Sequence, residues 1–244
     1  MFSTHVWRDG AQHQTLIAAV AVLVMSALLV GCEFVTCDQT ADRFESVPVA
    51  GIESVRIIAE AGSLEVDGQT NLTDVDAEGI ACASSSGDLD EIQFEITTNG
   101  SAIVIEARTP GTNSEFDVRI TVPDSLLVEI EDGSGSIEVR SVAGLRITDG
   151  SGDVDVSGVA GNLAIENDGS GDLLLRDVAG SVDIESDGSG GITVSGIGGD
   201  VLVGNDGSGG ISVTDVAGDF TVRKDGSGGI DHSGIGGTID IPED

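Results

Sequence analysis

Six aspartates at regular intervals have the clearest capacity for chemistry in this chain. Each opens the tetrapeptide Asp-Gly-Ser-Gly, and consecutive copies are separated by 17, 19, 19, 19 and 19 residues. Carboxylate oxygens are preferred ligands of hard cations such as calcium. A ladder of such side chains could therefore bind divalent cations, with the candidate ligands Asp132, Asp149, Asp168, Asp187, Asp206 and Asp225.

A second interpretation gives the same aspartates a structural role. In a tight turn, an aspartate side chain can accept hydrogen bonds from backbone amides two and three residues further on, here those of the serine and the second glycine. Neighbouring carboxylates about 4.8 Å apart would repel each other by roughly 1 kcal/mol in water, and solvent ions can screen this repulsion. We expect the structural turn, with calcium binding as the alternative.

Catalysis has no clear candidates. No spacing suggests a nucleophile paired with a base, the acids are repeated without one distinct cluster, and residues 32–244 contain no tyrosine or tryptophan. His232 is the only histidine after residue 31, at a position where earlier repeats carry an apolar residue. We expect it to cap an exposed end and not to serve as a ligand or base. The protein is therefore expected to be no enzyme and to use no cofactor apart from the calcium considered above.

The N-terminal segment is typical of an exported protein. Leu16 to Val30 is a nearly unbroken apolar run, as long as a signal-peptide core and short for a membrane span. The residues Leu29-Val30-Gly31-Cys32 resemble the lipobox of bacterial lipoproteins, in which the cysteine becomes lipidated and begins the mature protein. We expect a lipoprotein signal peptide over 1–31 and lipidation of Cys32, with cleavage by an ordinary signal peptidase as the alternative.

Two further cysteines are available for a disulfide. If Cys32 is lipidated, Cys37 and Cys82 are the only other thiols, in a compartment that permits disulfides. We expect them to pair, which would stabilise the fold by roughly 3–4 kcal/mol. The alternative is two unrelated thiols, with Cys82 filling a small core position.

The charge balance excludes one class of partner. The chain has 43 acidic and 10 basic residues, a net charge of -33. Because phosphate contact needs a basic surface, we expect no binding to nucleic acid. An acidic surface of this kind is either simply solvated or suited to a cation-rich environment.

The elements that must position these residues are strands. From 44 to 131 apolar and polar residues alternate in short runs separated by turn residues, and no stretch has helical spacing. From 132 to 244 each repeat carries five apolar positions, such as Ile192, Val194, Ile197, Val201 and Val203, with glycine-rich corners between them. A repeat this short predicts an all-β fold, a single-stranded β-solenoid of 19-residue coils. We expect a tether over 32–43, irregular N-terminal β coils or a cap over 44–131, and regular coils over 132–244.

The repeats resemble a known family. Val122-Pro123, then Leu127-Val128-Glu129-Ile130, then serial Ser-Gly-hydrophobic units are similar to the bacterial putative-adhesin β-strand-repeat family and its head-GIN-type relatives. The resemblance is strongest over 122–241. It implies a right-handed β-helix, often exported or lipid-anchored, with no established enzymatic activity. The near-uniform Asp-Gly-Ser-Gly corner is a departure from that family.

These observations lead to one functional hypothesis and two alternatives. We expect a lipid-anchored, non-catalytic adhesive or structural module that contacts envelope polymers or proteins and meets the membrane through its lipid. Glu33 is not the aspartate that resembles an inner-membrane retention signal, which favours the outer membrane. The alternatives are a divalent-cation-binding envelope protein and a scaffold in envelope stress or assembly.

Overall fold

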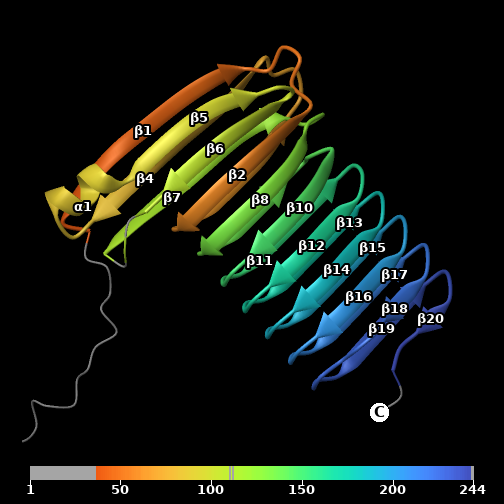
Figure 1. The fold of residues 1–244 in the computed structure, drawn as a ribbon. Helices are drawn as coiled ribbons and strands as arrows, with labels where there is room; N and C mark the ends of the chain where they lie inside the picture. Colours follow the sequence, from red (N-terminus) through yellow and green to blue (C-terminus); the bar gives the residue numbers. More distant parts are fainter. Residues whose placement is uncertain (1–36, 110, 112, 243–244) are drawn as a thin grey trace, which may run out of the picture. The chain divides into compact units, whose positions relative to one another are not determined.

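The computed structural model describes residues 37–242 except 110 and 112, and this part of the chain is nearly all β (Figure 1). It forms two ten-stranded sheets. Sheet A contains β1 (Gln39–Pro48), β3 (Leu64–Gln69), β4 (Asp74–Ala83), β7 (Ser114–Pro123), β9 (Ile137–Arg140), β11 (Val154–Val159), β13 (Leu173–Val178), β15 (Ile192–Ile197), β17 (Ile211–Val216) and β19 (Ile230–Ile235). Sheet B contains β2 (Ser54–Ala61), β5 (Gln93–Asn99), β6 (Ala102–Arg108), β8 (Leu127–Ser134), β10 (Gly144–Asp149), β12 (Leu163–Asp168), β14 (Val182–Asp187), β16 (Val201–Asp206), β18 (Phe220–Val222) and β20 (Ile239–Asp240).

Successive strands of the repeats alternate between the two sheets. Each repeat gives one strand to sheet A and one to sheet B, and each strand pairs in parallel with its equivalent in the next repeat. Leu173 lies opposite Ile192, and Ile192 lies opposite Ile211, a register of 19 residues. The sequence period is therefore the period of the parallel pairing.

The predicted apolar positions are confirmed as the core. In one repeat, Ile192, Val194, Ile197, Val201 and Val203 are all buried between the sheets. The residues are mostly β-branched, which suits extended backbone, and equivalent residues stack on one another from repeat to repeat. Stacked aliphatic side chains thus fill a core that holds few aromatic rings.

The N-terminal strands pair in an order that the sequence does not suggest. β2 pairs in parallel with both β6 and β8, and β3 pairs in parallel with β7 and β9. β4 is antiparallel to β1 and β7, and β5 is antiparallel to β6. Both sheets are therefore mixed, and long-range pairing joins this region to the first repeat.

Two local features differ from expectation. β1 begins at Gln39, so the last residues of the predicted tether over 32–43 lie in a strand, because they pair with β4 along the edge of sheet A. The helix α1 (Ser86–Glu91) was not predicted, since it buries no residue and has no apolar period. Its signal is the cap, where Ser85 accepts a hydrogen bond from the Asp88 amide. No helix within the described residues is both long and apolar enough to span a membrane.

Candidate functional site

The six aspartates form one continuous line at the end of the sheet B strands. In the register, Asp132 lies opposite Asp149, Asp149 opposite Asp168, and Asp168 opposite Asp187. Asp187 lies opposite Asp206, which forms a bridge with Asp225. We call these six residues the aspartate row.

The aspartate row points into the stack. Asp149, Asp168, Asp187 and Asp206 are each 1% exposed, and Asp132 is also buried. In the 19-residue repeats the aspartate comes three residues after a buried isoleucine or valine, a spacing that would place the two side chains on opposite faces of a regular strand. A register shift beside Thr148 accommodates one extra residue, so the aspartate still faces inward. The sequence interpretation assumed that solvent ions screen the repulsion between these carboxylates. Their burial shows that this assumption is wrong.

As ionised groups, the carboxylates of the aspartate row accept no hydrogen bond of normal geometry among the described residues, although corner amides lie near them and a proton on one carboxyl group could be shared with the next. Both side-chain oxygens of the five buried members, and Oδ1 of Asp225, are inaccessible and unpaired. The glycine amides of the corner serve the backbone: Gly152 donates to the Ser170 carbonyl at 2.8 Å, and Gly171 donates to the Ser189 carbonyl at 3.0 Å. The predicted hydrogen bond from the second glycine to the aspartate side chain is therefore wrong, because the next corner takes that amide.

Burial changes the acidity of the aspartate row. It raises the pKa of Asp132 and Asp206 to about 7 and the pKa of Asp149, Asp168 and Asp187 to about 6, because loss of water disfavours the charged carboxylate. For Asp149, Asp168 and Asp187 the preceding aspartate of the row raises the pKa further, whereas a hydrogen bond with the following aspartate lowers it; for Asp206 both neighbours raise the pKa. Corner amides, such as that of Gly133 near Asp132, lower the pKa only in part.

The glycines that follow each aspartate are required by the stacking of corners. Gly190 has φ +141°, and a Cβ added there would lie 1.6 Å from the Gly171 carbonyl oxygen. Such close approach leaves no room for a side chain. The Gly-Ser-Gly part of the motif is thus architectural, whereas the aspartate itself is left unexplained by hydrogen bonding.

A second set of polar corner residues provides a contrast. These side chains are exposed, and each accepts a hydrogen bond from the backbone amide 19 residues further on. Asp200 accepts from the Asp219 amide at 2.8 Å, and Asp219 accepts from the Thr238 amide at 2.6 Å. The same residue type is therefore solvated and paired at one corner of the repeat, and buried and unpaired at the other.

The cysteines lie at the N-terminal end of the described chain. Cys37 and Cys82 form a disulfide with a Cα–Cα distance of 5.2 Å, beside the pairing of β1 with β4. With Glu115 they are the only described group of three potential metal ligands in close range, but the two sulfurs are bonded to each other. Cys32 and the predicted signal peptide over 1–31 lie outside the described residues.

His232 lies on β19, the last strand of sheet A. It is opposite Val213, is exposed, and its ring lies 6.0 Å from that of Phe220. This position at the end of the stack agrees with the expected end-exposed role. No acidic side chain among the described residues forms an ion pair with it.

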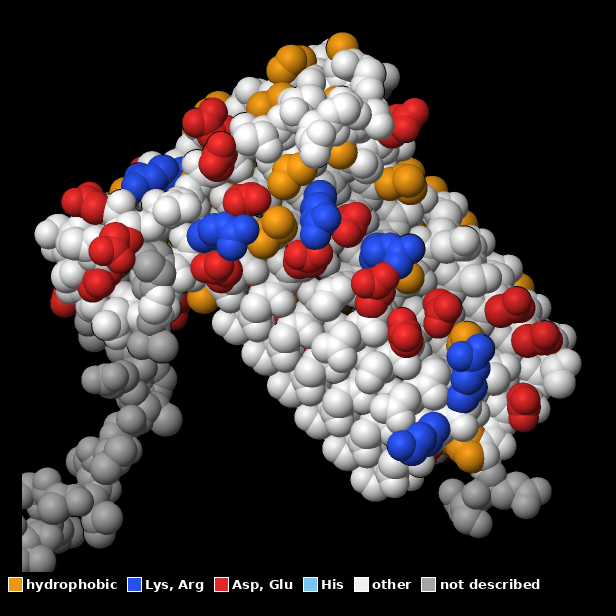
Figure 2. All heavy atoms as spheres, viewed as in Figure 1, with side chains coloured by type: hydrophobic (Ala, Val, Ile, Leu, Met, Phe, Trp, Pro, Cys, Tyr) orange, Lys and Arg blue, Asp and Glu red, His pale blue; other side chains and the backbone are white. Residues whose placement is uncertain are grey.

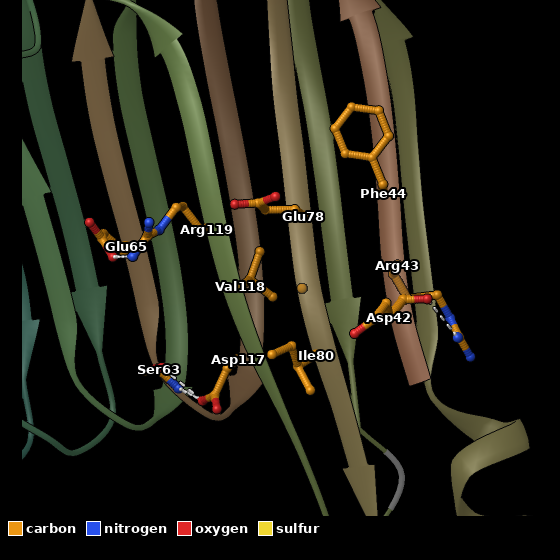
Figure 3. A pocket seen from close by; sticks show the side chains of 11 residues that line it. Asp42, Arg43, Phe44, Ser63, Glu65, Glu78, Ile80, Asp117, Val118 and Arg119 are labelled. Carbon is orange, nitrogen blue, oxygen red and sulfur yellow. Dashed lines mark hydrogen bonds and ion pairs between the residues drawn. The ribbon is translucent and has the colours of Figure 1, made fainter. Parts of the chain in front are cut away.

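A groove of about 470 Å³ lies on the outer face of sheet A across β1, β4, β7 and the start of β3 (Figure 3). Two exposed apolar side chains mark it, Phe44 at 64% and Ile80 at 54% exposure. In the register, Phe44 lies opposite Glu78, which lies opposite Arg119. We call this the outer-face groove. The sequence analysis missed it, because Phe44 and Ile80 come from strands whose pairing no local pattern reveals.

Only part of the charge in the outer-face groove is paired. Arg119 forms an ion pair with Glu65 at 2.5 Å, and Asp117 accepts hydrogen bonds from Ser63. Among the described residues the side chain of Glu78 has neither a hydrogen bond nor an ion pair. Elsewhere on the viewed surface basic side chains lie beside acidic ones (Figure 2). The groove therefore combines apolar surface with an unpaired acid.

Several solved structures are similar to this chain, at low sequence identity. A putative adhesin from Bacteroides fragilis is 16% identical, covering 84% of this chain and 98% of its own, with a TM-score of 0.38. A putative cell adhesion protein from Clostridium sporogenes is 12% identical, covering 83% and 99%, with a TM-score of 0.30. A putative lipid binding protein from Parabacteroides distasonis is 11% identical, covering 84% and 98%, with a TM-score of 0.31. No protein-family model and no curated protein sequence matches the chain. At these TM-scores the solved structures say nothing about its ligand.

Proposed function

We propose that this protein is an exported, lipid-anchored and non-catalytic adhesive module of the cell envelope that holds a partner protein in its outer-face groove. The groove is the observation that carries the proposal. It has a volume in the range of ligand pockets, and it exposes Phe44 and Ile80. Large exposed apolar side chains beside unpaired charge are typical of interaction sites.

The charge of the outer-face groove indicates the chemistry of its partner. Four carboxylates line it, from Asp42, Glu65, Glu78 and Asp117, against the guanidinium group of Arg119, whereas the Arg43 side chain points away from those of Asp42 and Phe44 (Figure 3). An extended basic segment of another envelope protein, carrying an apolar side chain, would complement both the charge and Phe44. The net charge of -33 would also speed the approach of such a partner.

Export and anchoring are supported by the cysteines. The Cys37–Cys82 disulfide fits a compartment outside the cytoplasm, and the lipobox-like residues end at Cys32, five residues before it. We further infer that residues 132–244 wind as a β-solenoid, because each repeat gives one strand to each sheet in a parallel register of 19 residues; the right hand is what the family resemblance implies. Outer-membrane placement follows from Glu33 and belongs to the same proposal.

A peptide-binding experiment tests the groove. The full chain, purified in detergent, is titrated with a labelled peptide of about ten alternating lysines and valines, and with its glutamate–valine counterpart. We expect the basic peptide alone to bind, and the Phe44→Ser/Ile80→Ser variant to bind at least about tenfold more weakly. Leu127→Ser is the matched control, since Leu127 is 55% exposed but lies on sheet B. Equal binding by the double variant, or binding only to envelope polysaccharide, would overturn the proposal.

A further inference from the structure

We propose that the aspartate row binds calcium ions inside the stack, with each ion held between the carboxylates of two consecutive repeats. This inference is independent of the outer-face groove. It starts from the buried carboxylate oxygens of the aspartate row, which have no hydrogen-bond partner among the described residues. Buried carboxylates are normally paired with a cation or with donors. No ion pair of the described residues involves the aspartate row.

The spacing of the aspartate row suits calcium. Neighbouring strands of a sheet lie about 4.8 Å apart, and Asp168 and Asp187 are direct partners on such strands. Calcium binds oxygen at about 2.3–2.6 Å, roughly half that spacing, whereas magnesium needs about 2.0–2.1 Å and strict octahedral geometry. An ion between two adjacent aspartates could be reached by both carboxylates, which supply at most four of the roughly six to eight oxygens that calcium takes, so corner carbonyls or water would complete its shell.

The charge of the aspartate row sets an expected stoichiometry. Six carboxylates carry six negative charges, which three calcium ions neutralise. Ions in alternate gaps also avoid placing two dications in neighbouring gaps. We therefore expect up to three ions per chain, between Asp132 and Asp149, between Asp168 and Asp187, and between Asp206 and Asp225.

Burial links the ions to folding. The Gly-Ser-Gly corner follows each aspartate directly, and the carboxylates have almost no contact with solvent. Ions would enter as the repeats assemble or open locally, and they would bind the folded chain only. Calcium should accordingly raise the melting temperature.

Direct measurement of bound metal tests the inference. The full chain is stripped with chelator, dialysed against micromolar calcium at pH 7.5, and analysed for metal after gel filtration. We expect about three calcium ions per wild-type chain, about two for Asp168→Asn/Asp187→Asn, and few magnesium ions in a parallel dialysis. The matched control is Asp200→Asn/Asp219→Asn, which removes the same charge from the exposed corner and keeps the oxygen that accepts the amide hydrogen bond. The control should bind as the wild type does.

A melting experiment shows whether the variants are folded. Wild type and control should melt at least about 5 °C higher in millimolar calcium than in chelator, and the Asp168→Asn/Asp187→Asn variant should show a smaller shift. Wild-type protein with less than one calcium ion per chain and no calcium-dependent shift would overturn the proposal. That result would mean that protons alone neutralise the aspartate row. An equal loss of calcium from the exposed-corner control would overturn it too.

Discussion

Asp168 and Asp187 lie opposite each other on β12 and β14, both 1% exposed. As ionised groups, neither carboxylate accepts a hydrogen bond of normal geometry among the described residues, whereas a proton held by Asp187 would be shared with Asp168. Two ionised carboxylates about 4.8 Å apart would repel by roughly 3 kcal/mol at an effective dielectric constant near 20. In the absence of metal, the pair must therefore hold protons or destabilise the fold.

Neutralising one member of the pair should stabilise the metal-free protein. In chelator at pH 8, Asp187→Asn should raise the free energy of unfolding by about 1–3 kcal/mol, because asparagine has the same shape and no charge to bury. Urea unfolding measures the change. Asp200→Asn, at the exposed corner, should stay within about 0.5 kcal/mol of wild type. A destabilised Asp187→Asn variant would contradict the prediction.

Stability in chelator should fall as pH rises. The ordinary carboxyl pKa is 3.8, and burial raises that of Asp168 to about 6 and that of Asp206 to about 7. The folded aspartate row therefore binds more protons than the unfolded chain between pH 4 and 7, so the free energy of unfolding decreases across this window. The urea midpoint should be higher at pH 5 than at pH 8, and the difference should shrink in Asp168→Asn/Asp187→Asn. A higher midpoint at pH 8 would refute this.

Loss of the disulfide should loosen the start of β1. Cys37 and Cys82 close a loop with a sequence separation of 45 residues, and Cys37→Ser should lower the free energy of unfolding by about 2–4 kcal/mol. Hydrogen exchange should increase most in β1, which lies at the edge of sheet A. Reductant should affect the wild type in the same way and leave Cys37→Ser unchanged. Uniform exchange across all strands would count against this account.

One corner glycine should be irreplaceable and another replaceable. Gly190→Ala forces a Cβ to within 1.6 Å of the Gly171 carbonyl oxygen at positive φ, whereas a Cβ at Gly229 meets nothing within 4 Å. We expect Gly190→Ala to cost at least about 3 kcal/mol or to prevent folding, and Gly229→Ala to cost less than about 1 kcal/mol. Thermal melts of the two variants give the comparison. Similar melting temperatures for the two variants would contradict this prediction, because they would mean that stacked corners can move apart to admit a side chain.

The lipid anchor depends on one residue. Labelled palmitate should be incorporated into the wild-type protein in cells and should be absent from Cys32→Ala, because Cys32 is the residue expected to carry the lipid at the start of the mature chain. The same variant should move from the membrane fraction to the soluble fraction. Undiminished labelling of Cys32→Ala would rule out this anchor.

The sequence alone determined the repeats and their core. Apolar residues at every second position, as in Ile192 and Val194, are enough to predict strands with one buried face, because side chains alternate along extended backbone. The glycine-rich corners are also predictable from the local sequence, because glycine adopts the positive φ that tight corners need. The sequence also contained a sign that the aspartate row faces inward. Ile147 and Asp149 are two residues apart, so their side chains share one face of a strand, but in the 19-residue repeats the spacing is three residues and this sign is lost.

Only the tertiary structure decided how distant strands meet. β1 pairs with β4, which brings Phe44 and Ile80 into one groove, and a register shift in sheet B turns Asp168 inward. The parallel register then aligns every aspartate with the next and leaves their carboxylates without partners. Local propensity specifies which face of a strand is apolar, but strand order and bulges depend on packing across the whole sheet. The outer-face groove and the aspartate row arise from those long-range contacts.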